Sequence, residues 1–530
     1  MLQTTRSYRG MVVAPHHQAA QAGLRVLQDG GNAIEAMVAA AAAITVVYPH
    51  MNAMGGDNFW LISIPGTKVI GIDACGAAAE KADVQFYRNL GLSAIPSRGH
   101  LAALTVAGAV SGWKEALMVN RKFCGGSLSL DRLMEDAIFH AETGVPVTKS
   151  LALNAASKFT ELKDVPGFKE AYLLRGEPLI EGQKIKQPRI AETFRKLVEN
   201  GLDDFYRGKL AKSIGADLER LGSPLRLDDL KQHHARRVNP LMLNLAGHNL
   251  YNMPPPTQGL ASLILLGIYD RLGIEHAEKY DFVHGLIEAT KSAFCVRDKI
   301  ITDPVYMDRD PSEFLESSVL DKMARNIDMN VSQPWPAQSS KGDTVWLGAI
   351  DSEGRAVSFI QSIYWEFGSG AVLEETGITW QNRGISFSLD PENYNCLKPF
   401  RRPFHTIQPA LAHLTDGRVM PYGSMGGEGQ PQTQAMIFSR HVLHGQELQQ
   451  AITAPRWLLG RTWGQETTNL RIENRYEKSI LSALRNVGHD IEVIGPFDEI
   501  MGHAGALVYR PDGLIEGAAD PRGDGIAAAF

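Results

Sequence analysis

The chain has 530 residues, 44% of them hydrophobic and 21% charged, which is typical of a globular protein that buries its own core. Its net charge of −6, without a basic stretch to pair with phosphates, argues against nucleic acid as a partner. The N-terminus lacks the apolar core of a signal peptide, and the most apolar run, 36–47, is too short to span a bilayer. We therefore expect no membrane partner.

The cysteines point to a reducing compartment. They are far apart in the sequence and form no Cys-x-x-Cys pair; they are Cys75, Cys124, Cys295 and Cys396. This spacing is typical of reduced, mostly buried thiols, and it predicts a cytoplasmic protein.

The first third of the chain predicts two helices and a strand pair. A helix is expected over 16–27, and an Ala-rich helix over 33–47 with Asn32 as its N-cap. Strands are expected at 59–64 and 68–72. The pattern up to residue 340 is then mainly helical, with clear helices at 128–142, 188–200, 257–272 and 281–300.

The pattern changes near residue 330. Residues 332–341 are rich in Ser, Pro and Gln without periodicity, and they predict an exposed, flexible loop. Short strands and turns follow to about 428, then helices at 431–443 and 447–454, then more strands. Runs of helices combined with runs of hairpins predict an α+β fold rather than a βαβ winding.

The usual signatures of metal and phosphate chemistry are missing. The close histidine pairs, His16-His17, His233-His234 and His441-x-x-His444, lack the spacing of a zinc motif, so surface or core histidines are the favoured interpretation. The glycine-rich segments fit neither a phosphate-binding loop nor a dinucleotide fingerprint, and Gly-x-Ser-x-Gly is absent. We expect neither a metal nor a cofactor.

The most informative point of the sequence is Asp343-Thr344. It opens a predicted strand that turns at Ser352-Glu353-Gly354 and returns over 355–362. A threonine at the start of an internal strand is unremarkable by itself. If the bond before Thr344 is cut, this residue carries a hydroxyl nucleophile and an α-amine base. The chain would then be the precursor of a two-chain amide hydrolase.

A second candidate is the segment Gly423-Ser424-Met425-Gly426-Gly427, between a predicted strand and a predicted helix. Successive glycine N–H groups at a helix start can point at a developing oxyanion. Taken alone, a simple strand-to-helix turn is the favoured interpretation.

Several segments occur in the order seen in γ-glutamyltransferases. They are Gly30-Gly31-Asn32-Ala33, Gly55-Gly56, Pro254-Pro255-Pro256-Thr257-Gln258-Gly259, Arg297, Asp303-Pro304, Asp343-Thr344, Phe367-Gly368-Ser369-Gly370, Arg402-Pro403, Gly426-Gly427, Ala454-Pro455-Arg456 and Ala519-Asp520-Pro521-Arg522. Each is weak alone, but their joint order spans nearly the whole chain, which resembles the γ-glutamyltransferase family of N-terminal nucleophile hydrolases.

The resemblance implies an αββα sandwich, with two antiparallel sheets between helical layers, and self-cleavage before Thr344. It implies a large subunit, 1–343, and a small subunit, 344–530, which together build one intertwined domain. The product would be an αβ heterodimer that can dimerise further. By position, the resemblance assigns Thr344 as the nucleophile and Ser362 to the place where the family usually has a supporting Thr hydroxyl. It assigns Gly426 and Gly427 to the oxyanion hole.

The substrate-binding residues differ from those of the family. By position, they are replaced by Cys75, Tyr364, Arg383, Ser386, His405 and Thr406. Cys75 stands in place of the Arg that binds the γ-glutamyl carboxylate, and Arg383 replaces a ligand of the glutamyl ammonium. The exchange favours an anion where the family holds a cation, and a γ-glutamyl donor would bury its ammonium unpaired.

We expect Arg383, His405 and Thr406 to hold the carboxylate of a short amide acid, with Tyr364 filling the remaining space. This pattern is similar to the oxamate amidohydrolase branch of the family, which releases ammonia from the monoamide of oxalate. A structural ion pair remains the alternative for Arg383, as does a structural role for His405. Two other functions stay open, namely γ-glutamyl or glutaryl acyl transfer, and an uncleaved relative that only binds ligands.

Overall fold

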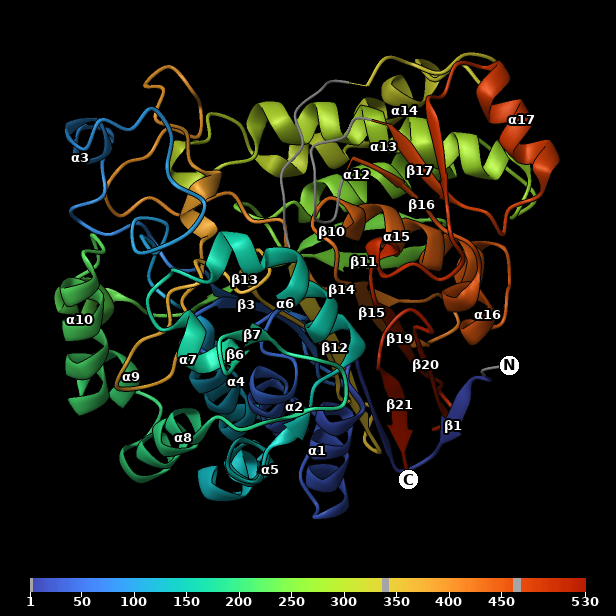
Figure 1. Ribbon diagram of the computed structural model, residues 1–530. Coiled ribbons are helices and arrows are strands. Elements are labelled where there is room, and N and C mark those ends of the chain that lie inside the picture. The colour runs from blue at the N-terminus through green and yellow to red at the C-terminus, as the bar shows by residue number, and fades with distance from the viewer. Residues whose placement is uncertain (1–2, 336–342, 461–468) are drawn as a thin grey trace.

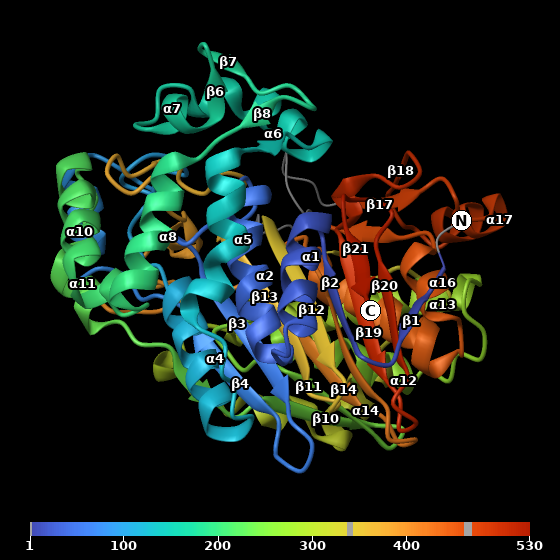
Figure 2. The same cartoon turned by 90° about the horizontal axis from the view of Figure 1, so that it is seen from below.

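The computed structural model describes residues 3–335, 343–460 and 469–530. Two seven-stranded antiparallel sheets pack face to face, and helices cover the outer face of each (Figures 1 and 2). The four layers lie side by side in Figure 2. This arrangement confirms the expected α+β class and the αββα sandwich. Residues 336–341 of the predicted loop lie outside the described residues.

Both sheets combine strands from distant parts of the chain. The first has the order β21 (Ile526–Ala529), β2 (Gly10–Ala14), β12 (Asp343–Asp351), β13 (Ala356–Tyr364), β3 (Asp57–Ser63), β4 (Ile70–Ala74) and β9 (Arg236–Val238). The second has the order β1 (Thr5–Ser7), β20 (Ile515–Ala519), β19 (Ala504–Tyr509), β15 (Val419–Ser424), β14 (Ala410–His413), β11 (His248–Asn252) and β10 (Leu241–Leu245). Each sheet therefore contains strands from both before and after Asp343.

Side chains of the central strands alternate between two apolar cores. Trp346 and Ile350 of β12, with Phe59 and Leu61 of β3, belong to the core between the sheets. The intervening Leu347 of β12 belongs to the core beneath the outer helices. This alternation follows from the two-residue period of a strand, and it requires both faces to be apolar because both are covered.

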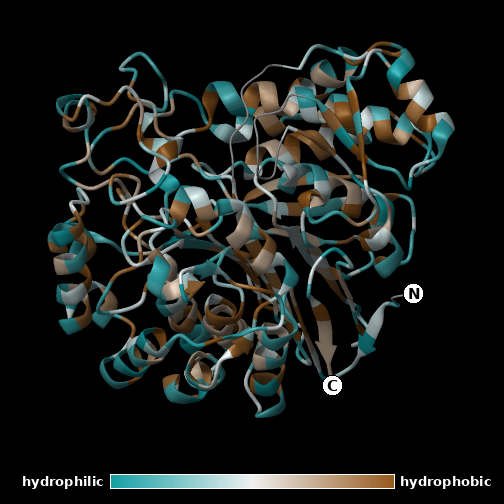
Figure 3. Cartoon of the chain, viewed as in Figure 1, coloured by the Kyte–Doolittle hydropathy of each residue, from teal (hydrophilic) through white to brown (hydrophobic). Residues whose placement is uncertain are grey.

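The helices form two outer layers. α1 (His17–Gln28), α2 (Ala33–Val47) and α4 (Ala109–Phe123) cover the first sheet, and α5 (Leu130–Thr143) and α8 (Pro188–Asn200) pack outside them. α12 (Gly259–Asp270), α15 (Gly429–Phe438) and α16 (Leu448–Thr453) cover the second sheet, with α13 (Tyr280–Ile300) outside. Apolar residues concentrate in the central strands and helices, whereas the peripheral helices mix polar and apolar segments (Figure 3).

The remaining elements are peripheral. The helices are α3 (Val84–Asn89), α6 (Lys149–Leu162), α7 (Phe168–Tyr172), α9 (Asp204–Arg207), α10 (Lys209–Leu221), α11 (Leu227–Gln232), α14 (Ser317–Arg325) and α17 (Lys478–Asn486). A three-stranded sheet contains β16 (Trp457–Leu459), β17 (Leu470–Glu473) and β18 (Ile491–Ile494). Two short ribbons pair β5 (Val145–Pro146) with β8 (Lys184–Ile185) and β6 (Leu173–Leu174) with β7 (Glu177–Pro178). Within the described residues, no helix is long and apolar enough to cross a membrane.

Helix α2 begins and ends where its sequence predicts. The Asn32 side chain accepts hydrogen bonds from the backbone N–H groups of Ile34 and Glu35, and the Glu35 carboxylate accepts one from the backbone N–H of Asn32. This reciprocal cap fixes the start of the helix. Every residue of α2 is buried, so its alanines allow close packing against α1 and α5 on all sides.

The stretch from about 100 to 340 is mainly helical, as expected, but the sequence did not predict its strands β9, β10 and β11. β10 and β11 pair across a tight turn in which Ala246 and Gly247 both have positive φ angles, and such a short hairpin leaves little periodicity to detect. The helix α17 lies where only strands were expected.

Candidate active site

Thr344 lies at the start of β12 and is fully buried. It is two residues before Trp346, so the strand alternation directs its side chain toward the space between the sheets. There the Thr344 hydroxyl oxygen accepts a hydrogen bond of 3.3 Å from Nε2 of Gln430 in α15. Oε1 of Gln430 in turn accepts the backbone N–H of Gln408, which fixes the orientation of the amide.

A β-bulge faces Thr344. Asp343 pairs with Tyr364, and Val345 pairs with Gln361, so β13 places one more residue than β12 in this interval. Ser362 and its successor therefore lie opposite Thr344, as the sequence prediction for Ser362 requires. The Ser362 hydroxyl accepts a hydrogen bond of 2.8 Å from the backbone N–H of Tyr364. Tyr364 has φ of +81°, a conformation that is costly for a bulky side chain and concentrates at functional sites.

The glycine turn between β15 and α15 reaches the same region. Gly426 and Gly427 have φ angles of +118° and +48°, which favour residues without a Cβ atom. Gln430, whose amide bonds to Thr344, is three residues further along the chain. The turn is thus a strand-to-helix connection, and the helix that follows it contacts the predicted nucleophile through Gln430.

A buried polar network joins this turn to the segment that carries Thr406. Nε2 of Gln258 donates to the backbone carbonyls of Gly427, at 2.7 Å, and of Thr406. Arg297 donates to Oε1 of Gln258 at 3.1 Å and forms an ion pair of 2.8 Å with Glu428. Gln258 and Arg297 belong to segments that carried the family resemblance, and the structure shows what they hold together.

Arg383 lies on a short 3₁₀ turn, Arg383–Ser386, and is 1% exposed. Its guanidinium carbon lies 3.8 Å from the ring centre of Tyr364, and Nη1 donates to the Thr406 hydroxyl at 3.1 Å. Nε and Nη2 have no hydrogen-bond partner among the residues that the structure describes. Burial lowers the pKa of Arg383 to about 10, although the neighbouring Tyr364 and Asp57 act to raise it. Since this pKa is still well above 7, the side chain remains cationic at neutral pH.

His405 bonds to a residue that the sequence prediction missed. Its Nε2 lies 3.1 Å from Oδ2 of Asp57, and both side chains are fully buried. Oδ1 of Asp57 accepts the backbone N–H groups of Gly76 and Gly108. Burial raises the pKa of Asp57 to about 7 and lowers the pKa of His405 well below its usual value. His405 is therefore neutral, and its Nδ1 has no partner within the described part of the chain.

Cys75 lies directly after β4, and its thiol lies close to Asp57 and His405. One potential ligand atom from each of the three lies within 4.8 Å of the others. A second such group contains His284, Glu288 and His489. The sequence spacing revealed neither group.

Each of these groups lies next to a cation of the protein. Burial lowers the pKa of His405, and the positive charges of Arg383 and Arg402 lower it further. In the second group, Nζ of Lys291 lies 2.7 Å from Glu288. These charges oppose the binding of a metal ion.

The protein is an αββα sandwich with a buried threonine at the start of a central strand, and a glycine turn leads into the helix that contacts this threonine. This combination defines the N-terminal nucleophile hydrolase class. The family model of gamma-glutamyltranspeptidase matches residues 19–530, and the chain belongs to this family.

Relatives and solved structures agree with this assignment. The chain is 53% identical over 524 residues to the oxamate amidohydrolase proenzyme of Klebsiella pneumoniae subsp. pneumoniae, with 99% of each chain covered. It is 39% identical to the glutathione hydrolase-like YwrD proenzyme of Bacillus subtilis, with 98% of each covered. The crystal structure of cephalosporin acylase from Bacillus halodurans matches with a TM-score of 0.91 and 32% identity, over 100% of this chain and 97% of that one. The chain is an amidohydrolase of this family.

Proposed function

We propose that the chain is a precursor that cleaves its own Asp343–Thr344 bond and then hydrolyses a small amide that carries a carboxylate. Oxamate is the proposed substrate, with oxalate and ammonia as products. The relative from Klebsiella pneumoniae, 53% identical over almost the full length, is an oxamate amidohydrolase proenzyme, and this supports the assignment.

The observation that carries the substrate class is the state of Arg383. A guanidinium buried to 99% retains two nitrogen atoms without a hydrogen-bond partner among the described residues. Leaving such donors unsatisfied is costly, and a carboxylate matches the planar fork of an arginine with two parallel hydrogen bonds. An anionic substrate would satisfy Nε and Nη2, while Thr406 and Tyr364 hold the guanidinium in place.

In the first step, the Thr344 hydroxyl attacks the carbonyl carbon of Asp343. The peptide bond is exchanged for an ester, which frees the α-amine of Thr344, and water hydrolyses the ester. The products are 1–343, ending in a new carboxylate, and 344–530, beginning with Thr344. Because both sheets contain hydrogen-bonded strands of both segments, we expect the two segments to remain together as an αβ heterodimer.

In the second step, the α-amine of Thr344 accepts the proton of its own hydroxyl, and the oxygen attacks the amide carbon of the substrate. We assign the N–H groups of Gly426 and Gly427 to the developing oxyanion, and Ser362 to the orientation of the nucleophile. Ammonia leaves with the proton from the amine. Water then hydrolyses the ester and releases the acid.

The role of His405 differs from the one expected from the sequence. When Asp57 is ionised, Nε2–H of His405 donates to it, so Nδ1 is a hydrogen-bond acceptor. An acceptor cannot bind a carboxylate, but it can accept an N–H of the substrate amide. We therefore assign Arg383 and Thr406 to the carboxylate and His405 to the amide end.

Acyl transfer from a γ-glutamyl donor is the alternative. It needs a group that binds the glutamyl ammonium, and Asp57 is a carboxylate of this pocket. However, the oxygens of Asp57 already bond to two backbone N–H groups and to His405, which favours an amide acid over a γ-glutamyl donor as the substrate.

The four cysteines form no disulfide, in keeping with the proposed cytoplasmic location.

Ammonia release from a panel of small amides tests this proposal. The panel contains oxamate, neutral amides without the acid group, and γ-glutamyl-p-nitroanilide, for which release of the aniline is measured. We expect oxamate to be turned over best and the neutral amides to be poor substrates. Turnover of the γ-glutamyl anilide as fast as oxamate would instead favour the transferase.

A further inference from the structure

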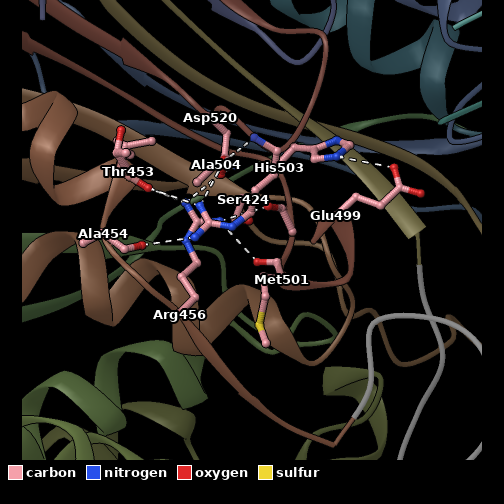
Figure 4. Close-up of polar contacts among 12 residues, drawn as sticks. Ser424, Thr453, Ala454, Arg456, Glu499, Met501, His503, Ala504 and Asp520 are labelled. Atoms are coloured by element: carbon pink, nitrogen blue, oxygen red, sulfur yellow. Dashed lines mark hydrogen bonds and ion pairs between the residues drawn. The ribbon is translucent and has the colours of Figure 1, made fainter. Parts of the chain in front are cut away.

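Two of the segments that carried the family resemblance contain no residue of the proposed reaction, yet they meet in a buried ion-pair network. Arg456 follows α16 and Asp520 follows β20, and their side chains form an ion pair of 2.6 Å (Figure 4). Arg522 bonds to Asp520 at 3.1 Å and to Glu473 of β17 at 2.8 Å. All four side chains are buried.

Arg456 and Asp520 both hold the chain at residues 501–504. Nη1 of Arg456 donates to the backbone carbonyls of Met501, at 3.2 Å, and of Gly502, at 2.9 Å. Oδ2 of Asp520 accepts the backbone N–H of Ala504 at 2.7 Å. Figure 4 shows these contacts converging on the turn that leads into β19. The ion pair thus fixes both sides of this turn.

The segment 501–504 contacts residues 424 and 425, which lead into the glycine turn at Gly426 and Gly427. The backbone carbonyl of His503 accepts the N–H of Met425 at 3.1 Å, and Ser424 pairs with Ala504 in the sheet. Gly502, with φ of +82°, approaches so closely that a Cβ atom there would lie 2.5 Å from the carbonyl oxygen of Met425. Gly426, the first glycine of the oxyanion-binding turn, directly follows Met425 in the chain.

We infer that Arg456 and Asp520 are positioning residues for the oxyanion-binding turn at Gly426 and Gly427. This inference rests on the proposed function, in which these two N–H groups stabilise the oxyanion. Such donors act only when they lie within hydrogen-bond distance of the oxygen, and a shift of about 1 Å can cost a factor of about 10² in rate. A buried ion pair is a poor source of stability but fixes one arrangement of its neighbours.

The variants Asp520→Asn and Arg456→Lys test the inference. Asn retains the shape of Asp520 without its charge, and Lys retains the charge of Arg456 without its paired donors. The control is Asp351→Asn. Asp351 is also buried, pairs with Arg355 at 2.9 Å and accepts backbone N–H groups, but it lies at the opposite end of β12 from Thr344.

We expect the kcat of both variants for oxamate, per molecule of cleaved enzyme, to fall about 10- to 100-fold with KM within about twofold. Asp351→Asn should lower the melting temperature but leave kcat near that of the parent. Unchanged kcat in either folded variant, or an equal loss in the control, overturns the inference.

Hydrogen exchange provides a readout that does not depend on the substrate. Backbone amides of 424–428 should exchange faster in Asp520→Asn and Arg456→Lys than in the parent, and at the parent rate in Asp351→Asn. Unchanged exchange in both variants would overturn the inference even if oxamate is not the substrate. A parent enzyme that hydrolyses other amides but not oxamate contradicts the proposed substrate alone.

Discussion

Replacing Arg383 should abolish most of the activity on an anionic amide without preventing self-cleavage. Nε and Nη2 of Arg383, which have no partner among the described residues, can form two charge-assisted hydrogen bonds with a substrate, worth about 1.5–3 kcal/mol each. Truncating one partner of a buried charged contact typically costs about 2–5 kcal/mol. The Arg383→Ala enzyme should therefore lose at least about 30-fold in kcat/KM for oxamate, and on the order of 10²- to 10⁴-fold if both bonds form.

Arg383→Lys should also weaken kcat/KM substantially, because an ammonium cannot reproduce the planar fork or its stacking on Tyr364. The control is Arg401→Lys, since Arg401 is also buried but bonds to Thr302 and the carbonyl of Cys396. The assay is ammonia release from oxamate, with a denaturing gel to measure processing. Full activity of Arg383→Ala on oxamate would refute the proposed pocket.

Three further predictions concern pH, Ser362 and metals. Burial raises the pKa of Asp57 to about 7, so this carboxyl becomes neutral as pH falls and no longer repels an anionic substrate. KM for oxamate should therefore decrease as pH falls through about 7, and Asp57→Asn should remove this dependence. By contrast, kcat should rise with pH, because the α-amine of Thr344 must be neutral to act as the base. The apparent pKa should lie at or below about 7.7–8.0, the range of a free α-amine, and a flat kcat profile from about pH 5 to 9 would count against this amine as the base. Ser362→Ala should lower kcat about 10-fold or more, because its hydroxyl bonds to the bulge that faces Thr344; an unchanged kcat would remove Ser362 from the mechanism. Exhaustive chelation should leave activity intact, and loss that one specific metal restores would overturn that expectation.

The sequence predicted the fold best where local signals and packing agree. The Ala-rich helix over 33–47 has the predicted bounds because Asn32 caps it and every residue of it is buried. The hairpin that begins at Asp343 was also clear, since two apolar strands flank a tight turn. In contrast, β10 and β11 each have five residues, and the pairing of β11 with β14 depends on a part of the chain far away in the sequence.

The site was predicted where residues act through their position in a motif, and missed where they act through contacts. Thr344 and the glycines at 426 and 427 stand out by residue type and by the elements around them. Asp57 directly follows Gly55-Gly56 with no motif of its own, and its partner His405 is 348 residues away. Asp57 begins β3, and His405 forms a bridge with Thr257, so their contact is a tertiary one that leaves no local signal in the sequence.

The proposed reaction depends first of all on Thr344, which must become the N-terminal residue of the active enzyme to serve as its nucleophile. Intact mass and N-terminal sequencing of the purified protein test this requirement directly, with Thr344→Ala as the comparison. We expect two fragments, 1–343 and 344–530, the second beginning with threonine, and a single inactive chain of 530 residues for Thr344→Ala. An active enzyme that consists of one uncut polypeptide would contradict the proposed reaction.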